Sequence, residues 1–164
     1  AIGYEKVVFN TALIRDPSLI QKAADYFGKQ SIVASIDAKK SNGEYLCAIA
    51  DGTELIKRSP VDLAKEAERL GAGEIIINSI DQDGMMNGYN LDLVRSVSNA
   101  VTVPVTAVGG ARGIRDLKTV LEEGHAHAAA GGSMFVYYGR LKAVLITAPT
   151  EKELLAAGVY SEDI

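Results

Sequence analysis

A group of carboxylates and glycines follows a run of β-branched residues near the middle of the chain. The run covers 75–77, and it is followed by Asp81, Asp83, Gly84 and Gly88. Such a run is typical of a strand that is buried on both faces, as in a parallel sheet. In parallel α/β folds, ligands bind at the loops that follow the carboxyl ends of the strands. The stretch therefore predicts a ligand site, with a solvated turn as the alternative because Asp and Gly are common turn residues.

Glycine-rich turns follow the last two predicted strands. These turns are Gly109–Gly110 and Gly131–Gly132–Ser133. Barrel enzymes commonly hold phosphate at the loops after their last two strands, where backbone N–H groups face the anion. A serine hydroxyl can add a donor, so we predict a phosphate site, with tight turn geometry alone as the alternative. Asn10 and Thr11 end the first predicted strand and could hold a second anion, although the pair is also an ordinary strand end.

Two aspartates at predicted strand ends have the chemistry for general acid–base catalysis. Asp37 ends the second predicted strand, and Asp83 follows the third. One carboxylate can transfer a proton when its pKa suits the step. No pairing of serine with histidine is apparent, because His125 and His127 flank a strand start, away from the predicted catalytic end. We expect both histidines to be packing or surface residues.

Strands and helices are expected to alternate along the chain. The expected strands are short and buried, at 6–10, 31–36, 75–77, 104–108 and 126–130. Helices are expected at 17–27, 60–70, 91–100, 114–123 and 150–157, with a further helix or turn after 133. Asp16 is the expected N-cap of the first helix. Asn42–Gly43 is a strong hairpin signal, so we expect a β-hairpin insertion at about 39–57 within a single domain, 1–164.

This alternation indicates an α/β fold with a parallel sheet. Two features favour a (β/α)8 barrel over an open doubly wound sheet. Nearly every predicted strand ends in a polar or glycine signature, and Ser35-Ile36-Asp37 recurs as Ser79-Ile80-Asp81. A (β/α)8 barrel usually takes about 250 residues, whereas this chain has 164 and five predicted strands. We therefore expect a partial barrel of about five β-α units.

Composition excludes several classes of protein. The formal charge is −4, which does not suggest nucleic-acid binding. No apolar run approaches the ~18 residues that a membrane span needs, and no segment resembles a signal peptide. The single cysteine, Cys47, cannot form an internal disulfide, and no cysteine–histidine cluster has metal-binding spacing. We therefore expect a cytoplasmic protein without a metal or another cofactor.

The central motif, DQDG at 81–84 followed by Gly88-Tyr89, closely resembles the signature of the cyclase subunit of imidazole glycerol phosphate synthase. The resemblance extends over VVFNTA, SIDAKK, GAGEIIINSID and the final glycine turns, and corresponds to the C-terminal two-thirds of that barrel. It implies a lyase of histidine biosynthesis that receives ammonia from a glutaminase subunit through the barrel interior. The implied substrate is a phosphorylated small molecule, a phosphoribulosyl-formimino ribonucleotide with a phosphate at each end. The implied products are imidazole glycerol phosphate and an aminoimidazole carboxamide ribotide.

The resemblance also implies roles for individual residues. Asp83 matches the catalytic acid, and Asp37 matches a supporting carboxylate at the same mouth. The residues that match one phosphate site are Gly84, Gly110 and Ser133. Asn10 and Thr11 match part of the other phosphate site. Lys6 and Glu74 match charged residues that gate ammonia at the opposite, glutaminase-facing end.

Several departures leave alternatives open. Gln82 stands where the family usually has arginine, Met85 where it usually has threonine, and Asn90 where it has an acid. The family's other essential aspartate lies on a first strand that this chain lacks. Residues 133–146, together with Asn78, look more like a second branch, whose members deliver ammonia for amidino-sugar synthesis in surface polysaccharides. A third interpretation is a non-catalytic, truncated barrel that self-associates through its open edges.

Overall fold

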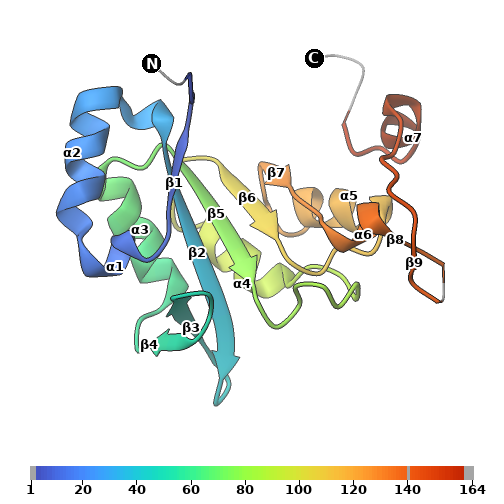
Figure 1. Ribbon diagram of the computed structural model, residues 1–164, viewed down its shortest axis with the longest axis horizontal. Helices are drawn as coiled ribbons and strands as arrows, with labels where there is room; N and C mark the ends of the chain where they lie inside the picture. The colour runs from blue at the N-terminus through green and yellow to red at the C-terminus, as the bar shows by residue number, and fades with distance from the viewer. Residues whose placement is uncertain (1–2, 140, 161–164) are drawn as a thin grey trace.

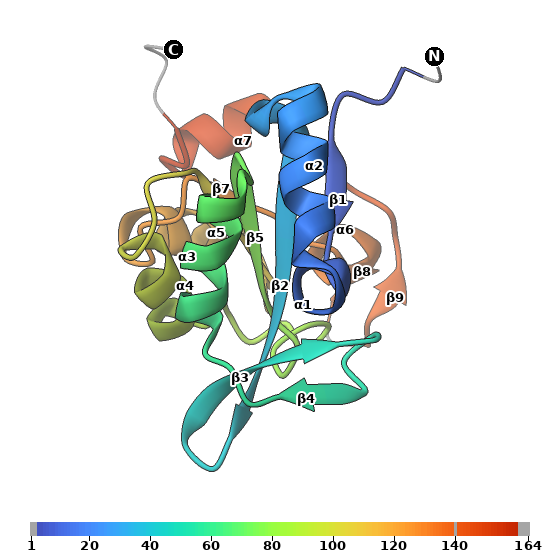
Figure 2. The ribbon, with the colours of Figure 1, turned by 90° about the vertical axis from the view of Figure 1, so that its left-hand side faces the viewer.

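The computed structural model describes residues 3–139 and 141–160, and its centre is a seven-stranded sheet with helices packed against one face (Figures 1 and 2). The strands of this sheet are β1 (Val7–Phe9), β2 (Ile32–Ser41), β3 (Glu44–Ile49), β4 (Glu54–Ile56), β5 (Glu74–Ser79), β6 (Val105–Val108) and β7 (Ala128–Ala129). The helices are α1 (Ala12–Arg15), α2 (Pro17–Phe27), α3 (Pro60–Leu70), α4 (Leu91–Ser98), α5 (Ile114–Glu122), α6 (Ser133–Val136) and α7 (Glu151–Ala156), with a 3-10 turn at Lys29–Ser31. Two further strands, β8 (Tyr137–Tyr138) and β9 (Ala143–Val144), form a separate hairpin.

The parallel strands follow one another in chain order. β1 pairs with β2, β2 with β5, β5 with β6, and β6 with β7, and all four pairings are parallel. An open doubly wound sheet would reverse its strand order at a switch point, and no reversal occurs among these strands. The prediction of an α/β fold that forms part of a (β/α)8 barrel is confirmed.

The core lies between the sheet and its helices. On β5, Ile75, Ile77 and Ser79 point toward the helices and are buried, whereas Glu74, Ile76 and Asn78 point to the other face and are partly exposed. This alternation follows from the two-residue period of a strand. The expectation that 75–77 is buried on both faces is therefore wrong for Ile76, because among the described residues no helix covers the face on which it lies.

The first strand also differs from its prediction. Residues 6–10 were expected to be a buried strand, but Val7 and Val8 are 47% and 55% exposed. In the described part of the chain β1 pairs with β2 alone, so its second edge has no neighbour. An apolar sequence predicts burial only when another strand or helix is there to cover it.

Local signals at helix ends give mixed outcomes. Ser59 accepts hydrogen bonds from the backbone N–H groups of Val61 and Asp62, and Gly71 ends α3 in the left-handed region at φ 103°. Asp16 precedes α2 as expected, but it does not cap the helix with its side chain. Its carboxylate instead accepts a 2.6 Å hydrogen bond from the Ser18 hydroxyl.

The long strand β2 extends past the end of β5 into a hairpin. Its first part pairs with β1, and its last part, from Asp37 to Ser41, pairs antiparallel with β3. Asn42 and Gly43 form the turn with φ of 50° and 89°, the positive values that a two-residue hairpin turn requires. β4 then pairs with β3, so this small antiparallel unit projects beyond the carboxyl ends of the parallel strands (Figure 2).

Candidate functional site

Asp37 lies at the carboxyl end of the parallel sheet with an amide donor on each of its oxygens. The Asn10 side-chain amide donates to Oδ2 at 3.2 Å, and the Asn78 side-chain amide donates to Oδ1 at 3.0 Å. Asn10 also donates to the Ser35 carbonyl oxygen at 3.0 Å, which fixes its position against β2. An ionised carboxylate only accepts hydrogen bonds, so two N–H donors match that form of Asp37.

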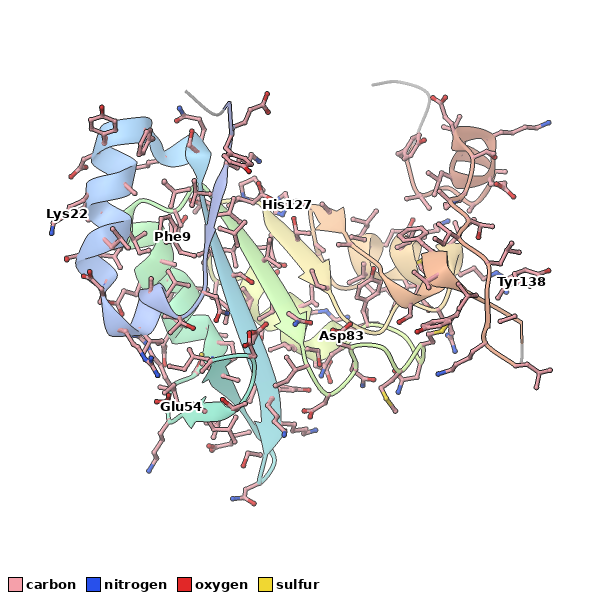
Figure 3. The ribbon with its side chains drawn as sticks, viewed as in Figure 1. Phe9, Lys22, Glu54, Asp83, His127 and Tyr138 are labelled. Atoms are coloured by element: carbon pink, nitrogen blue, oxygen red, sulfur yellow. The ribbon has the colours of Figure 1, made fainter. Side chains whose placement is uncertain are left out.

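Asp83 lies just beyond the carboxyl end of β5, in the loop that leads to α4 (Figure 3). Its backbone N–H donates to the Ser79 carbonyl oxygen at 3.0 Å, which anchors the loop to the strand. The residue is exposed, and no hydrogen bond of its carboxylate is found within the described residues. The side chain is therefore accessible to a ligand, unlike that of Asp37, whose two oxygens are both engaged.

The third aspartate of this region, Asp81, binds the backbone of β2. Its Oδ2 accepts a 2.7 Å hydrogen bond from the backbone N–H of Lys40. The pairing of β2 with β5 ends at Ala38 and Ser79, so the Lys40 N–H lies past the last residue of β5. The Asp81 carboxylate therefore supplies the acceptor that a longer β5 would have provided.

The glycines of the predicted phosphate site are only partly brought together. A Cβ atom on Gly84 would lie 4.0 Å from Ser133 Oγ, so this loop residue and the first residue of α6 are neighbours. Gly110 instead packs against the Asp81–Asn90 loop, where its carbonyl oxygen accepts from the Gly88 N–H at 2.8 Å. A Cβ atom on Gly110 would overlap the Gly88 carbonyl oxygen. Close backbone packing is therefore sufficient to explain glycine at position 110.

The polar side-chain atoms of Asn10 and Thr11 contact each other, and Thr11 also contacts the turn between β3 and β4. The Thr11 hydroxyl donates to Asn10 Oδ1 at 3.3 Å and accepts from the Ala50 N–H at 3.3 Å. A second anion would have to compete with these contacts. The position of Asn10 beside Asp37 is the more direct structural observation.

Lys6 and Glu74 meet at the opposite end of the sheet. Lys6 Nζ lies 2.5 Å from Glu74 Oε2, and the Thr106 hydroxyl donates to Glu74 Oε1 at 3.2 Å. Glu74 and Thr106 lie on the sheet face that also carries Ile76 and Asn78, opposite the face against which the helices pack. The structure thus places an ion pair at the amino end of this face and Asp37 at its carboxyl end.

The sequence profile of the histidine biosynthesis protein family matches residues 1–142. The chain belongs to this family. A Geobacillus thermodenitrificans protein named "Imidazole glycerol phosphate synthase subunit HisF" is 44% identical over 87% of this chain and 59% of its own length. A Pseudomonas aeruginosa protein named "Putative imidazole glycerol phosphate synthase subunit hisF2" is 44% identical over 94% of this chain and 62% of its own length. A Nostoc protein, also named subunit HisF, is 37% identical over 98% of this chain and 63% of its own length.

The chain spans about three fifths of the length of the curated relatives it matches. Its resemblance to the imidazole glycerol phosphate synthase family is confirmed at the level of the family. The matched residues include both ends of the face described above, since the family profile begins before Lys6 and ends after Ser133.

The sequence pattern did not identify two polar residues that the structure places on the same sheet face as the site, Asn78 and Thr106. Asn78 on β5 is paired in register with Asp37 on β2. Thr106 on β6 is paired in register with Ile76 on β5, which lies two residues after Glu74 on the same face. Each follows from the predicted strands once the register is known, because residues of one face recur at every second position. The alternation of apolar and polar residues shows which residues of one strand share a face, but it does not show how neighbouring strands are aligned with one another.

Tyr89 and the two histidines make contacts that hold the fold together. Burial, together with the nearby charge of Asp116, raises the pKa of Tyr89, whose hydroxyl donates to the Ala130 carbonyl oxygen at 2.8 Å. That bond ties the Asp81–Asn90 loop to the end of β7. His125 and His127 are exposed, and they contact Asn99 and the backbone of Val105.

Within residues 3–139 and 141–160, no group of three His, Cys, Asp or Glu side chains could hold a metal ion. The same part of the chain contains no helix that is both long enough and apolar enough to cross a membrane.

Proposed function

We propose that the complete protein catalyses the cyclase reaction of imidazole glycerol phosphate synthase in histidine biosynthesis. Ammonia from a glutaminase subunit adds to the phosphoribulosyl-formimino ribonucleotide, and the products are imidazole glycerol phosphate and the aminoimidazole carboxamide ribotide. The observation that carries the proposal is the carboxyl end of the sheet, where exposed Asp83 precedes Gly84 and Ser133 is the neighbour of Gly84. The names of the relatives support this function over amidino-sugar synthesis and over a non-catalytic fragment.

In this proposal the phosphate of the substrate binds at Gly84 and Ser133. Gly84 has φ 74°, and the one described atom that a Cβ there would meet within 4 Å is Ser133 Oγ, so the backbone of Gly84 is open to an anion. A substrate held in this way would present its reacting end to the adjacent Asp83 carboxylate. Asp83 then transfers protons during ring closure, and Asp37 supports the reaction as a fixed negative charge.

Ammonia enters at the other end of the same face. The Lys6–Glu74 ion pair and Thr106 lie where a glutaminase subunit would dock, and side chains of β5 connect that end with Asn78. An exposed ion pair contributes little to stability. Its position at the amino ends of β1 and β5 suits a gate whose charged side chains separate to admit a neutral molecule.

The test of this function is Asp83→Asn in the complete protein, with ammonium as the donor so that the glutaminase is not needed. Asn cannot exchange a proton at neutral pH, so kcat should fall by about 10²- to 10⁴-fold while the substrate still binds. Asp92→Asn is the matched control, because Asp92 is an exposed aspartate on α4 with a loose ion pair to Arg95. Turnover within a few-fold of the unmodified protein would assign Asp83 to loop structure, where Asn serves equally well.

A further inference from the structure

Within the part of the chain that the structure describes, the side chain of Asn78 makes one hydrogen bond, to Asp37. Its amide nitrogen donates to Asp37 Oδ1 at 3.0 Å, and the two residues are paired across β2 and β5. Its amide oxygen is buried and has no partner within the described residues. Buried polar atoms nearly always have a partner, so each exception needs a physical reason.

The charge of Asp37 supplies that reason. Turning the amide over would place Asn78 Oδ1 against a carboxylate oxygen, and both atoms only accept hydrogen bonds. A hydrogen bond to an ionised group is roughly twice as strong as one between neutral groups. The observed orientation therefore leaves an oxygen unpartnered so that an N–H can face the carboxylate.

Gly109 provides the space that this orientation needs. A Cβ atom on Gly109 would lie 2.9 Å from Asn78 Oδ1 and 2.6 Å from the Ser79 carbonyl oxygen. The residue also has φ 90°, a conformation that residues with a side chain rarely adopt. A side chain at position 109 would therefore force the Ser79 backbone, the Asn78 amide or both to shift.

We propose that Asn78 is a positioning residue, which holds the Asp37 carboxylate toward the reacting substrate from a place that Gly109 keeps open. The inference rests on the proposed function, in which Asp37 is the supporting carboxylate. Asn10 holds the other carboxylate oxygen, so the two amides together fix the plane of the carboxylate. Asn10 directly follows the edge strand β1, whereas Asn78 lies within β5, which pairs with a strand on each side.

A double-mutant cycle in the complete protein tests the proposal. Asn78→Leu keeps the size of the side chain and removes the donor, and kcat should fall roughly 10- to 100-fold with KM changed less than about threefold. In an Asp37→Asn background the same substitution should lower kcat by less than about twofold, because the group it positions is already gone. An unchanged kcat in Asn78→Leu, or effects of the two substitutions that multiply in full, would overturn the proposal.

Asn99→Leu is the matched control. Asn99 also makes one side-chain contact, to His125, but it lies at the end of α4, near the amino ends of the strands. The kcat of Asn99→Leu should stay within about twofold of the value for the unmodified protein, because losing that contact should affect the stability of the fold and not the reaction.

A spectroscopic measurement separates this inference from the proposed function. The side-chain NH₂ resonances of Asn78 should shift in Asp37→Asn, whereas those of Asn99 should not, whether or not the protein turns over substrate. An unmoved Asn78 signal would overturn the positioning contact. Absence of ammonia-dependent turnover in the unmodified protein would instead refute the proposed function, and the amide signal would still decide the contact.

Discussion

Gly110 and Gly132 are both loop glycines at the carboxyl end of the sheet, but only Gly132 has room for a side chain. A Cβ atom on Gly110 would overlap the backbone of Gly88, whereas one on Gly132 would meet no atom of the described residues within 4 Å. A charge placed at position 110 would therefore disturb the loop as well as any bound anion. Position 132 allows the charge to be tested alone.

Gly132→Asp should weaken the binding of inorganic phosphate or a bisphosphate by roughly tenfold or more at low salt. The new carboxylate would lie next to Ser133 and repel the anion across a short distance. Isothermal titration calorimetry measures the effect, and Asn99→Asp is the control because it adds the same charge at the opposite end of the sheet. Equal affinities for the two variants would exclude a phosphate site at Ser133.

Cys47 gives the protein a pH dependence at alkaline pH. Burial raises the pKa of its thiol from an ordinary value of 9.0 to about 12. Between these values the folded state keeps the proton that the unfolded chain releases. Stability is therefore unaffected below pH 9 and decreases as the pH rises toward 12.

Raising the pH from 8 to 10.5 should lower the free energy of unfolding by about 2 kcal/mol through the Cys47 thiol. Urea unfolding of the unmodified chain and of Cys47→Ala at both pH values measures the difference. The variant starts less stable because it leaves a cavity, but its stability should change less with pH. Parallel pH profiles for the two chains would show that Cys47 is not the cause.

At the scale of elements, several contacts attach the β2–β3–β4 unit to the rest of the fold, among them three that involve β2 and β3. Asp81 accepts from the Lys40 N–H, Tyr45 and Asn90 exchange hydrogen bonds at 2.8 and 3.0 Å, and the Cys47 N–H donates to the Arg58 carbonyl oxygen at 2.9 Å. The Asp81 contact joins the unit to the loop at a point two residues from Asp83, whereas Asn90 lies at the far end of the same loop. Loss of this contact should loosen the unit and the loop together.

Asp81→Ala should lower the free energy of unfolding by about 0.5–1.5 kcal/mol, the net contribution of a hydrogen bond whose exposed donor can turn to water when its acceptor is removed. Amide hydrogen exchange at Lys40 should accelerate, while exchange in α5 should stay unchanged. Asp92→Ala, which removes an exposed carboxylate without such a contact, is the control. If Lys40 exchanges at its original rate in Asp81→Ala, another acceptor holds the strand.

The sequence predicted well those elements whose ends are determined by residues close together in the chain. Ser59, Pro60 and Gly71 define α3 through contacts within a few residues, so the pattern is sufficient. The burial of β1 was wrong because it depends on a neighbour outside the pattern. The contact between Asn78 and Asp37 was missed because it depends on the register of two strands that are far apart in the chain. Asp16 has the residue type of a cap, but the Ser18 hydroxyl competes for its carboxylate.

At the scale of the whole molecule, the 164-residue chain exposes apolar sheet at the β1 edge. Val7 and Val8 are 47% and 55% exposed on a strand that pairs on one side only in the described residues. An unpaired, apolar edge strand favours association with another chain. The chain produced on its own should therefore self-associate.

Val8→Lys should shift the chain toward monomer, because a charged residue on an edge strand opposes pairing with a second chain. Size-exclusion chromatography with light scattering measures the molar mass. Tyr26→Lys is the control, since Tyr26 is 82% exposed on the outer helix α2. A monomer for the unmodified chain at micromolar concentration would show that the β1 edge does not drive association.

Because each parallel strand pairs with the next parallel strand in the chain, the sheet can grow in the order in which a ribosome delivers it. Synthesis proceeds at about 5–20 residues per second, so each new β-α unit takes seconds to emerge. Helices and hairpins form in microseconds, and every unit can dock on the one before it without waiting for a distant partner. Translation speed, rather than a conformational search, would then set the pace at which this sheet is assembled in the cell.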